Sequence, residues 1–382
     1  MSEIVVKEVS SRKELKKFIR FNYEMYNNCP YAAPDFLEDT LDTFDPKKNA
    51  AFDFCDAKLF LAYKNGKIAG RVAGIINNKA NKTWDTHNVR FGWIDFIDDK
   101  EVSSALLKAV EDWGRQQGAN KIVGPLGFTD LDPEGMLIDG FDQLSTMSTI
   151  YNYPYYPKHL EQLGFEKEVD WVERQIIVPD KQYERTAKYF RVAEMSAKRY
   201  NLHIRKFKNM REIREGNYGK KIFDVVNKAY APLYGFSELS EKQIDQYVNS
   251  YLPLLDMRFL TVVEDEQDNI VAMGVGMPSL STALQKAKGK LFPFGWFYLA
   301  KALFVKHSNI IDLLLIGVLP EYQNKGVNAM LFADLIPVAQ KMGLKFAETH
   351  PQLETNEKSQ VQWDYLDAHI HKKRRCYQKN LK

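Results

Sequence analysis

A polar turn between two apolar segments holds the residues best suited to chemistry. It lies in the stretch VLPEYQNKGVNAMLF, residues 318–332. Gln323 and Asn324 offer amide donors, and Lys325 adds a cation. Gly326 would let the backbone approach a ligand closely, because glycine has no Cβ. This composition suits the binding of an anion.

The apolar run that follows the turn predicts a helix from Val327 to Met342, closed by Gly343. The N-terminus of a helix has backbone N–H groups without intrahelical partners and carries a partial positive charge, so it favours phosphate. We therefore expect a pyrophosphate-binding turn. The alternative is an ordinary helix cap, which uses the same residue types.

The predicted elements around this turn occur twice in the chain. In the first half, KLFLAYKNGKIAG predicts a hairpin, and a helix with one apolar face precedes the strand KIVGPLGF. In the second half, RFLTVVEDEQDNIVAMGVGM predicts a hairpin, and the helix after the turn precedes the strand LKFAETH. The recurring order predicts an α+β fold of two tandem lobes.

The second lobe resembles the GNAT acetyltransferase superfamily, whose acetyl-CoA site follows the pattern V-x-P-x-x-Q/R-x-x-G-x-G/A. The matching residues are Val318, Pro320, Gln323 and Gly326. Asn328 departs from the pattern at its last small residue. The resemblance covers about residues 203–380 and extends more faintly to residues 1–178. It implies that each lobe is a mixed, mostly antiparallel sheet flanked by helices, with two central strands that splay apart to receive pantetheine.

The predicted domains are an N-terminal GNAT-like lobe at residues 1–178, a connecting helix at 179–202 and a C-terminal acyltransferase lobe at 203–382. The C-terminal lobe carries an insertion at about 279–308. In the first lobe the corresponding turn is Asp98-Asp99-Lys100-Glu101, whose carboxylates would repel a pyrophosphate. We therefore expect CoA to bind only the second lobe.

The resemblance implies direct attack of an amine on the acyl-CoA thioester, which needs an oxyanion donor, a base and an acid. A backbone N–H near Val318 is the expected oxyanion donor. Tyr365 stands where many relatives place the acid, with a packing role as its alternative. The predicted CoA-binding residues are Val318, Leu319, Gln323, Asn324, Lys325, Gly326, Val327, Asn328 and Asn356. For Asn356, capping of a helix is the alternative role.

The base is less clear from the sequence. Asp312 stands in the apolar strand IIDLLLIGV, where an unpaired charge would be costly, so it could act as a base or lie at a strand end in water. Glu348 and His350 alternate on one strand and are equal candidates. His369 and His371 lack a third ligand, so no metal is expected.

Composition indicates an ordinary globular protein. The 382 residues carry a net charge of +3, which indicates no general nucleic-acid or membrane field. Three unclustered cysteines favour a reducing compartment, and the charged start lacks a signal-peptide core. No apolar run reaches the roughly 18 residues of a membrane span. We expect a cytoplasmic protein, with a homodimer left open.

The insertion holds many aromatic residues, in the stretch LFPFGWFYLAKALF. They could pack between the lobes, line a substrate pocket, form a dimer contact or rest on a membrane. We expect residues 291–304 to be mostly buried, near the mouth of the second lobe's cleft.

The leading hypothesis is acetyl transfer from acetyl-CoA, or another acyl-CoA, to a small-molecule or peptide amine. One alternative is a non-catalytic protein that binds acyl-CoA or another ligand. The other is an aminoacyl-tRNA-dependent transferase, which the near-neutral charge disfavours. Neither the acceptor nor the acyl length follows from the residues.

Overall fold

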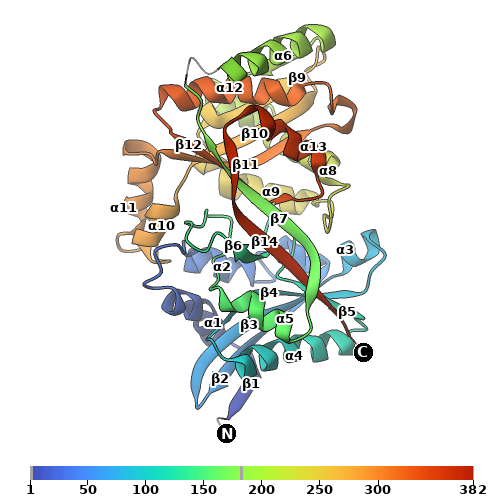
Figure 1. Cartoon of the computed structure of the whole chain (residues 1–382), viewed down its shortest axis with the longest axis vertical. Coiled ribbons are helices and arrows are strands. Elements are labelled where there is room, and N and C mark those ends of the chain that lie inside the picture. Colours follow the sequence, from blue (N-terminus) through green and yellow to red (C-terminus); the bar gives the residue numbers. More distant parts are fainter. Residues whose placement is uncertain (1–2, 181–183, 382) are drawn as a thin grey trace. The chain divides into compact units, whose positions relative to one another are not determined.

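The computed structural model describes residues 3–180 and 184–381. The chain forms two compact units, each assembled from separate stretches. Unit 1 comprises Met1–Trp171, Leu280–Lys301 and Lys372–Lys382. Unit 2 comprises Val172–Ser279 and Ala302–His371. Figure 1 shows both units as sheets flanked by helices, so the predicted α+β class of two tandem lobes is confirmed.

Unit 1 is built on a mixed sheet. Its own strands are β1 (Ile4–Glu8), β2 (Cys55–Lys64), β3 (Lys67–Asn77), β4 (Asn88–Phe96), β5 (Lys121–Gly124) and β6 (Met136–Asp139). Parts of β7 (Glu166–Ile177) and β14 (Ala368–Asn380) complete it. Its helices are α1 (Arg12–Met25), α2 (Leu37–Thr43), α3 (Asn78–Thr83), α4 (Lys100–Gln116), α5 (Tyr155–Gln162), α10 (Ser281–Ala287) and α11 (Gly295–Ala300). The first four strands pair antiparallel, β4 and β5 pair parallel, and β14 pairs antiparallel with β5.

Alternation along the strands gives this sheet two apolar faces. Phe60 and Val72 face a core that includes Leu106, Val110 and Trp113 of α4. Residues next to them on the same strands face a second core, which includes Phe18 and Ile19 of α1. The two helices therefore cover opposite faces.

Unit 2 has the same plan. Its strands, besides the remainder of β7 and β14, are β8 (His203–Arg205), β9 (Leu260–Glu264), β10 (Ile270–Pro278), β11 (Ile310–Val318), β12 (Phe346–Thr349) and β13 (Gln352–Leu353). Its helices are α6 (Glu184–Tyr200), α7 (Met210–Glu215), α8 (Tyr218–Tyr230), α9 (Glu241–Tyr251), α12 (Val327–Lys341) and α13 (Glu357–Val361). Short 3-10 turns span Leu252–Leu254, Met257–Phe259, Pro320–Tyr322 and Gln362–Tyr365.

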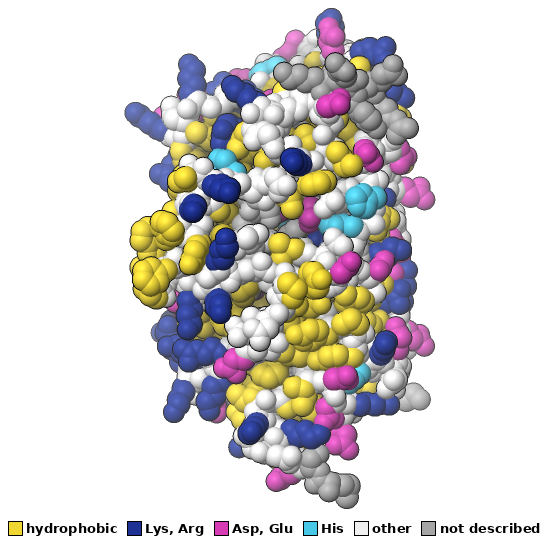
Figure 2. All heavy atoms as spheres, turned by 60° about the vertical axis from the view of Figure 1, so that its left-hand side comes forward, with side chains coloured by type: hydrophobic (Ala, Val, Ile, Leu, Met, Phe, Trp, Pro, Cys, Tyr) yellow, Lys and Arg dark blue, Asp and Glu magenta, His cyan; other side chains and the backbone are white. Residues whose placement is uncertain are grey.

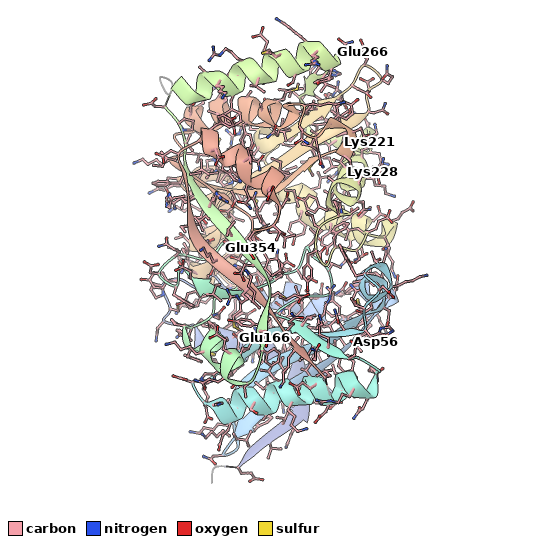
Figure 3. The ribbon with its side chains drawn as sticks, turned by 45° about the vertical axis from the view of Figure 1, so that its right-hand side comes forward. Asp56, Glu166, Lys221, Lys228, Glu266 and Glu354 are labelled. Carbon is pink, nitrogen blue, oxygen red and sulfur yellow. The ribbon has the colours of Figure 1, made fainter. Side chains whose placement is uncertain are left out.

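Helices cover both faces of this sheet as well. α12 and α6 share one core with Val263, whereas α8 shares the opposite core with Val262. On α8 the apolar residues face the sheet, and Lys221 and Lys228 lie on the exposed side (Figure 3). One face of α8 is thus committed to the core, as its amphipathic pattern requires.

The units differ from the predicted ranges at their boundaries. The first stretch of unit 1 ends at Trp171, inside β7, and its last stretch begins at Lys372, inside β14. The predicted connector at 179–202 belongs to unit 2, where α6 packs against α12; its residues 181–183 lie outside the described residues. Two long strands each contribute to both units, and an alternating pattern does not reveal where a strand changes partners.

The insertion also differs from expectation. Residues 280–301 belong to unit 1, so the insertion is not wholly part of the second lobe. The expected burial of residues 291–304 is wrong for most of the aromatic side chains: the exposed fractions are 72% for Phe292, 69% for Phe294 and 50% for both Trp296 and Phe297. The apolar composition had suggested burial because exposed aromatics are unusual on a monomer.

Among the described residues, no helix combines the length and the apolar character that crossing a bilayer requires.

Candidate functional site

A cavity of about 920 Å³ lies in unit 2, where β11 extends beyond the end of its parallel partner strand, β12. The register pairs Ile310–Leu313 of β11 with Phe346–Thr349 of β12, and β12 ends there. β11 continues to Val318, and Ile316, Gly317 and Val318 line the cavity. This arrangement matches the expected cleft between splayed central strands.

The backbone of β11 presents donors and acceptors to this cleft. The Leu319 N–H donates to the Val271 carbonyl at 2.9 Å, on the β10 side. Because N–H directions alternate along a strand, the Val318 N–H points to the opposite side, toward the cleft. Tyr230, which lines the cavity, supports this direction. Its hydroxyl donates a hydrogen bond of 3.0 Å to the carbonyl of Ile316, two residues before Val318 and therefore on the same side of β11. The Val318 N–H is thus oriented to donate to a ligand oxygen.

The polar turn closes the cleft at the start of α12. Asn324 and Gly326 have φ of 60° and 73°, a left-handed conformation that Asn and Gly adopt at low cost. Gly326 is the N-cap of α12, and no side chain caps the helix there. Gln323 donates its side-chain N–H to the Val318 carbonyl at 3.2 Å, which joins the turn to β11.

Helix α6 supports this turn from behind. A Cβ on Gly326 would lie 2.6 Å from Ser196 Oγ and 2.7 Å from Val192 Cγ1. The Ser196 hydroxyl donates to the Lys325 carbonyl at 2.7 Å. The glycine is therefore required by helix packing as well as by its φ. The sequence predicted only a connecting role for α6, because an amphipathic pattern indicates a buried face but not which element covers it.

No protein-family model matches the chain. It is 29% identical over 391 residues to protein YghO of Escherichia coli strain K12, covering 99% of this chain and 95% of that protein. It is 26% identical over 337 residues to a bacterial ceramide synthase of Caulobacter vibrioides, covering 86% and 84%.

Among solved structures, a tandem GNAT protein from the clavulanic acid biosynthesis pathway superposes with a TM-score of 0.56, at 9% identity, over 100% of this chain and 99% of that one. The chain has the tandem GNAT fold. At this level of identity, the likeness shows the fold alone.

In the GNAT fold of unit 2, six of the nine predicted CoA-binding residues line the cavity. They are Val318, Gln323, Asn324, Gly326, Asn328 and Asn356. Asn356 also caps α13, accepting a hydrogen bond from the Ser359 N–H at 3.3 Å.

The side chains of the other three point elsewhere. Leu319 and Val327 are buried in the apolar cores on opposite faces of the sheet. The Lys325 ammonium lies over the rings of Tyr200 and Tyr322, at 5.0 and 5.3 Å from their centroids. The backbone of these residues still belongs to the turn.

Tyr365 lines the cavity at the end of the last 3-10 turn. It is 37% exposed, and its ring packs edge-on against Tyr189 of α6 at 5.7 Å between centroids. The Lys188 ammonium lies 4.4 Å from the centroid of the Tyr365 ring. Lys188, Tyr189 and the loop Pro232–Tyr234 also line the cavity, and the sequence reasoning missed all of them.

The predicted base candidates are not among the residues that line this cavity. Asp312 is 2% exposed and lies beside Glu348 in the register of β11 and β12. Glu348 faces His371, with 3.7 Å between Oε2 and Nε2. These groups lie in the paired part of the strands, before the splay begins, which explains their separation from the cavity. His350 follows β12, where its N–H donates to Leu313.

In unit 1, the helix that corresponds to α12 has a different N-terminus. Asp99 caps α4 by accepting from the Glu101 N–H at 2.9 Å, and Lys64 pairs with Asp99. Hydrogen bonding to Lys64 lowers the pKa of Asp99. Asp98 pairs with His159 at 3.0 Å. A carboxylate already occupies this helix end, so it is unsuited to phosphate.

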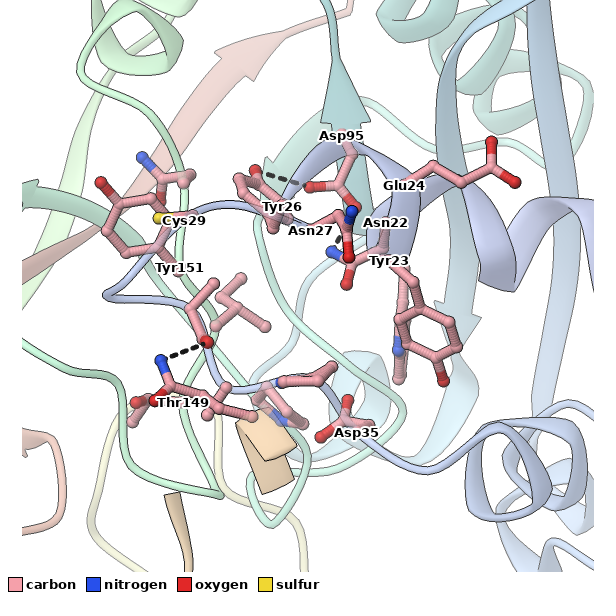
Figure 4. A pocket seen from close by; sticks show the side chains of 18 of the residues that line it. Asn22, Tyr23, Glu24, Tyr26, Asn27, Cys29, Asp35, Asp95, Thr149 and Tyr151 are labelled. Atoms are coloured by element: carbon pink, nitrogen blue, oxygen red, sulfur yellow. Dashed lines mark hydrogen bonds between the residues drawn. The ribbon is translucent and has the colours of Figure 1, made fainter. Parts of the chain in front are cut away.

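Unit 1 nevertheless contains a cavity of about 880 Å³, shown in Figure 4. Asp95 lines it and accepts hydrogen bonds from Arg71 at 2.7 Å and from Tyr26 and Asn22 at 3.0 Å. Asp35 also lines it.

The neighbouring loop of unit 1 is acidic. Burial is the main cause that raises the pKa of Asp130 to about 7 and that of Asp132 to about 6. Asp132 accepts from the Thr129 N–H at 3.0 Å. These carboxyls therefore form part of the folded loop and do not simply extend into water.

Proposed function

We propose that this chain is a CoA-dependent N-acyltransferase whose thioester site is the cavity of unit 2. The observation that carries the proposal is the turn at the start of α12. Its helix has no side-chain cap, its backbone is left-handed at Asn324 and Gly326, and it opens onto the splayed edge of β11. A pyrophosphate would accept hydrogen bonds from the first N–H groups of α12.

The residues support a direct transfer. The amine nitrogen attacks the thioester carbonyl, whose oxygen develops negative charge and accepts from the Val318 N–H. The carbon–sulfur bond then breaks, and the leaving thiolate takes the hydroxyl proton of Tyr365. The amide nitrogen releases one proton to water, and water returns one to Tyr365. The products are an amide and free CoA thiol, so atoms and protons balance.

For the acceptor we propose a long-chain amino alcohol, with a CoA thioester as donor. The support is the similarity to a protein named as a ceramide synthase, over 86% of this chain. A ceramide is the amide of a fatty acid and such an amino alcohol. The apolar part of the cavity wall, which includes Val192, Leu233 and Ile316, is suited to an acyl chain.

The test is a matrix of donors and acceptors. Acetyl-CoA and palmitoyl-CoA are each incubated with sphinganine, spermidine or glucosamine, and released thiol and amide product are measured. We expect thiol release and the matching amide with sphinganine. Product with spermidine or glucosamine alone would keep the reaction class and overturn the proposed acceptor.

A non-catalytic acyl-CoA-binding protein is the second candidate, favoured because none of the predicted bases lines the cavity. Calorimetry separates the two. Binding of one CoA per chain, with no thiol release from any pair in the matrix, would establish the binding protein and refute the enzyme.

A further inference from the structure

The insertion presents a hydrophobic surface that the reaction does not use. Phe292, Phe294, Trp296 and Phe297 are all half exposed or more, and we call them the aromatic patch. Figure 2 brings the α10–α11 side of Figure 1 forward, and hydrophobic side chains protrude there with Lys and Arg side chains around them. Four large aromatic side chains exposed within six residues form an apolar patch of the kind that marks an interaction surface.

The patch stands on an ordered base within unit 1. Ala283, Leu284 and Ala287 of α10 are buried. Gln285 donates to the carbonyls of Pro30 and Ala32 at 2.8 and 3.0 Å. These contacts fasten α10 to the segment that follows α1.

The turn that carries the patch is also held by its own backbone. The Leu37 N–H donates to the Gly289 carbonyl at 3.1 Å, and the Trp296 N–H donates to the Leu291 carbonyl at 2.8 Å. The Trp296 indole N–H donates to the Pro293 carbonyl at 2.9 Å. The aromatic exposure is thus a feature of a folded turn.

Charge identifies the partner. Residues 280–301 contain no Asp or Glu, and their four lysines, Lys286, Lys288, Lys290 and Lys301, are all exposed. A net charge of +4 beside exposed Phe and Trp suits an anionic bilayer: lysines attract the headgroups, and aromatic rings lie at the headgroup boundary. A second copy of this patch would instead bring eight lysines together, which disfavours self-association through it.

We propose that residues 286–301 dock unit 1 onto an anionic phospholipid bilayer, with the aromatic patch in the interface and the lysines on the headgroups. Gln285, Lys288 and Lys290 also line the cavity of unit 1. The docked surface therefore adjoins a cavity of about 880 Å³. The proposal concerns location and does not depend on the reaction of unit 2.

Co-sedimentation of the full chain with vesicles tests the proposal. We expect binding to vesicles of phosphatidylglycerol and phosphatidylcholine, little binding to phosphatidylcholine alone, and weakening in high salt. F292S/F294S should lower the partition coefficient about tenfold or more. K286Q/K288Q/K290Q should lower it by about fivefold for each lysine removed.

Matched variants control for bulk hydrophobicity and charge. M195S/Y251S removes exposed apolar side chains elsewhere, and K13Q/K16Q/K17Q removes the same charge from α1; both should bind like the parent. Melting temperatures confirm that each variant folds. Equal binding to neutral vesicles, or parental binding by F292S/F294S, would overturn the proposal. So would a dimer that F292S/F294S converts to a monomer, since the occupant would then be a second copy.

Discussion

At the scale of single residues, Tyr365 offers the most direct test of the proposed chemistry. Tyr365→Phe keeps the ring that packs on Tyr189 and under Lys188 and removes only the hydroxyl. We expect kcat to fall about 100-fold with CoA affinity nearly unchanged, because the proton donor is lost and the cavity wall is kept. Steady-state kinetics and calorimetry measure the two quantities.

Tyr251→Phe is the control, since Tyr251 is an exposed tyrosine of α9 that stacks on Tyr247. It should retain parental kcat. A Tyr365→Phe variant with parental turnover would leave Tyr365 as a packing residue of the cleft.

Asp130 should make the stability of unit 1 depend on pH. Its pKa rises to about 7 in the folded chain, first through burial and then through Asp132, while Arg90 opposes the rise. The folded state therefore holds this proton more tightly than the unfolded state, whose pKa is near the ordinary value of 3.8. Stability from Asp130 is complete below about pH 4 and is lost as the pH rises through about 7.

Asp130→Asn mimics the protonated carboxyl and should remove that loss. We expect the free energy of unfolding of the variant to exceed that of the parent by roughly 2 kcal/mol at pH 8 and to differ little at pH 4. Denaturant unfolding across this range measures the effect, with the exposed Asp85→Asn as control. A slope of stability against pH equal to that of the parent would contradict the assignment.

At the scale of elements, the start of α12 combines a ligand-facing turn with a helix contact. Gly326→Ala should lose CoA binding and destabilise unit 2 by roughly 1–3 kcal/mol, because φ is positive and the new methyl meets α6. Gly343→Ala is a matched control: its φ is 70°, and nothing lies within 4 Å of its added Cβ. It should show the smaller loss of stability and unchanged CoA binding.

Calorimetry and thermal unfolding of the two variants separate strain from contact. Equal loss of CoA binding in both would show that general destabilisation, not the turn, causes it.

The turn could be predicted because its information is local. Gly and Asn tolerate left-handed backbone, and they stand between an apolar strand and an apolar helix, so Gln323, Asn324 and Gly326 were identified from type and spacing. The contribution of Lys188 and Tyr189 to the cavity could not be predicted, because it depends on which helix packs against α12. The predicted base candidates Asp312 and Glu348 do not line the cavity, for a similar reason. Polar residues in an apolar strand suggested chemistry, but the strand splays only beyond them.

At the scale of the whole molecule, the C-terminal segment should be essential to the first unit. Residues Lys121–Gly124 of β5 pair with residues 377–380 of β14, and Arg375 forms an ion pair with Asp170 at 2.8 Å. Deleting residues 372–382 should expose the edge of β5, lower the melting temperature and promote aggregation.

Hydrogen exchange measures the loss locally, at the amides of β5. A synthetic peptide of residues 368–382, added to the truncated chain, should restore their protection. Unchanged protection in the truncated chain would contradict this role of β14.

The repeat order allowed two lobes to be predicted, but not their real composition. Periodicity indicates which face of a strand is buried but not which strands it pairs with. From the sequence, β7 and β14 were therefore each assigned to a single lobe. Their partners change along their length, a property of long-range pairing that no local pattern encodes.

The shared use of β14 has a consequence for synthesis of the chain on the ribosome. Proteins usually fold from the N-terminal domain onward as they emerge. Here the strand that completes the first unit is made after nearly all of the second unit. The edge of β5 that pairs with β14 therefore stays without this partner while unit 2 is translated. We therefore expect unit 2 to fold before unit 1 is complete, which reverses the usual order. The partly folded first unit is then the part of the nascent chain that we expect to need chaperones.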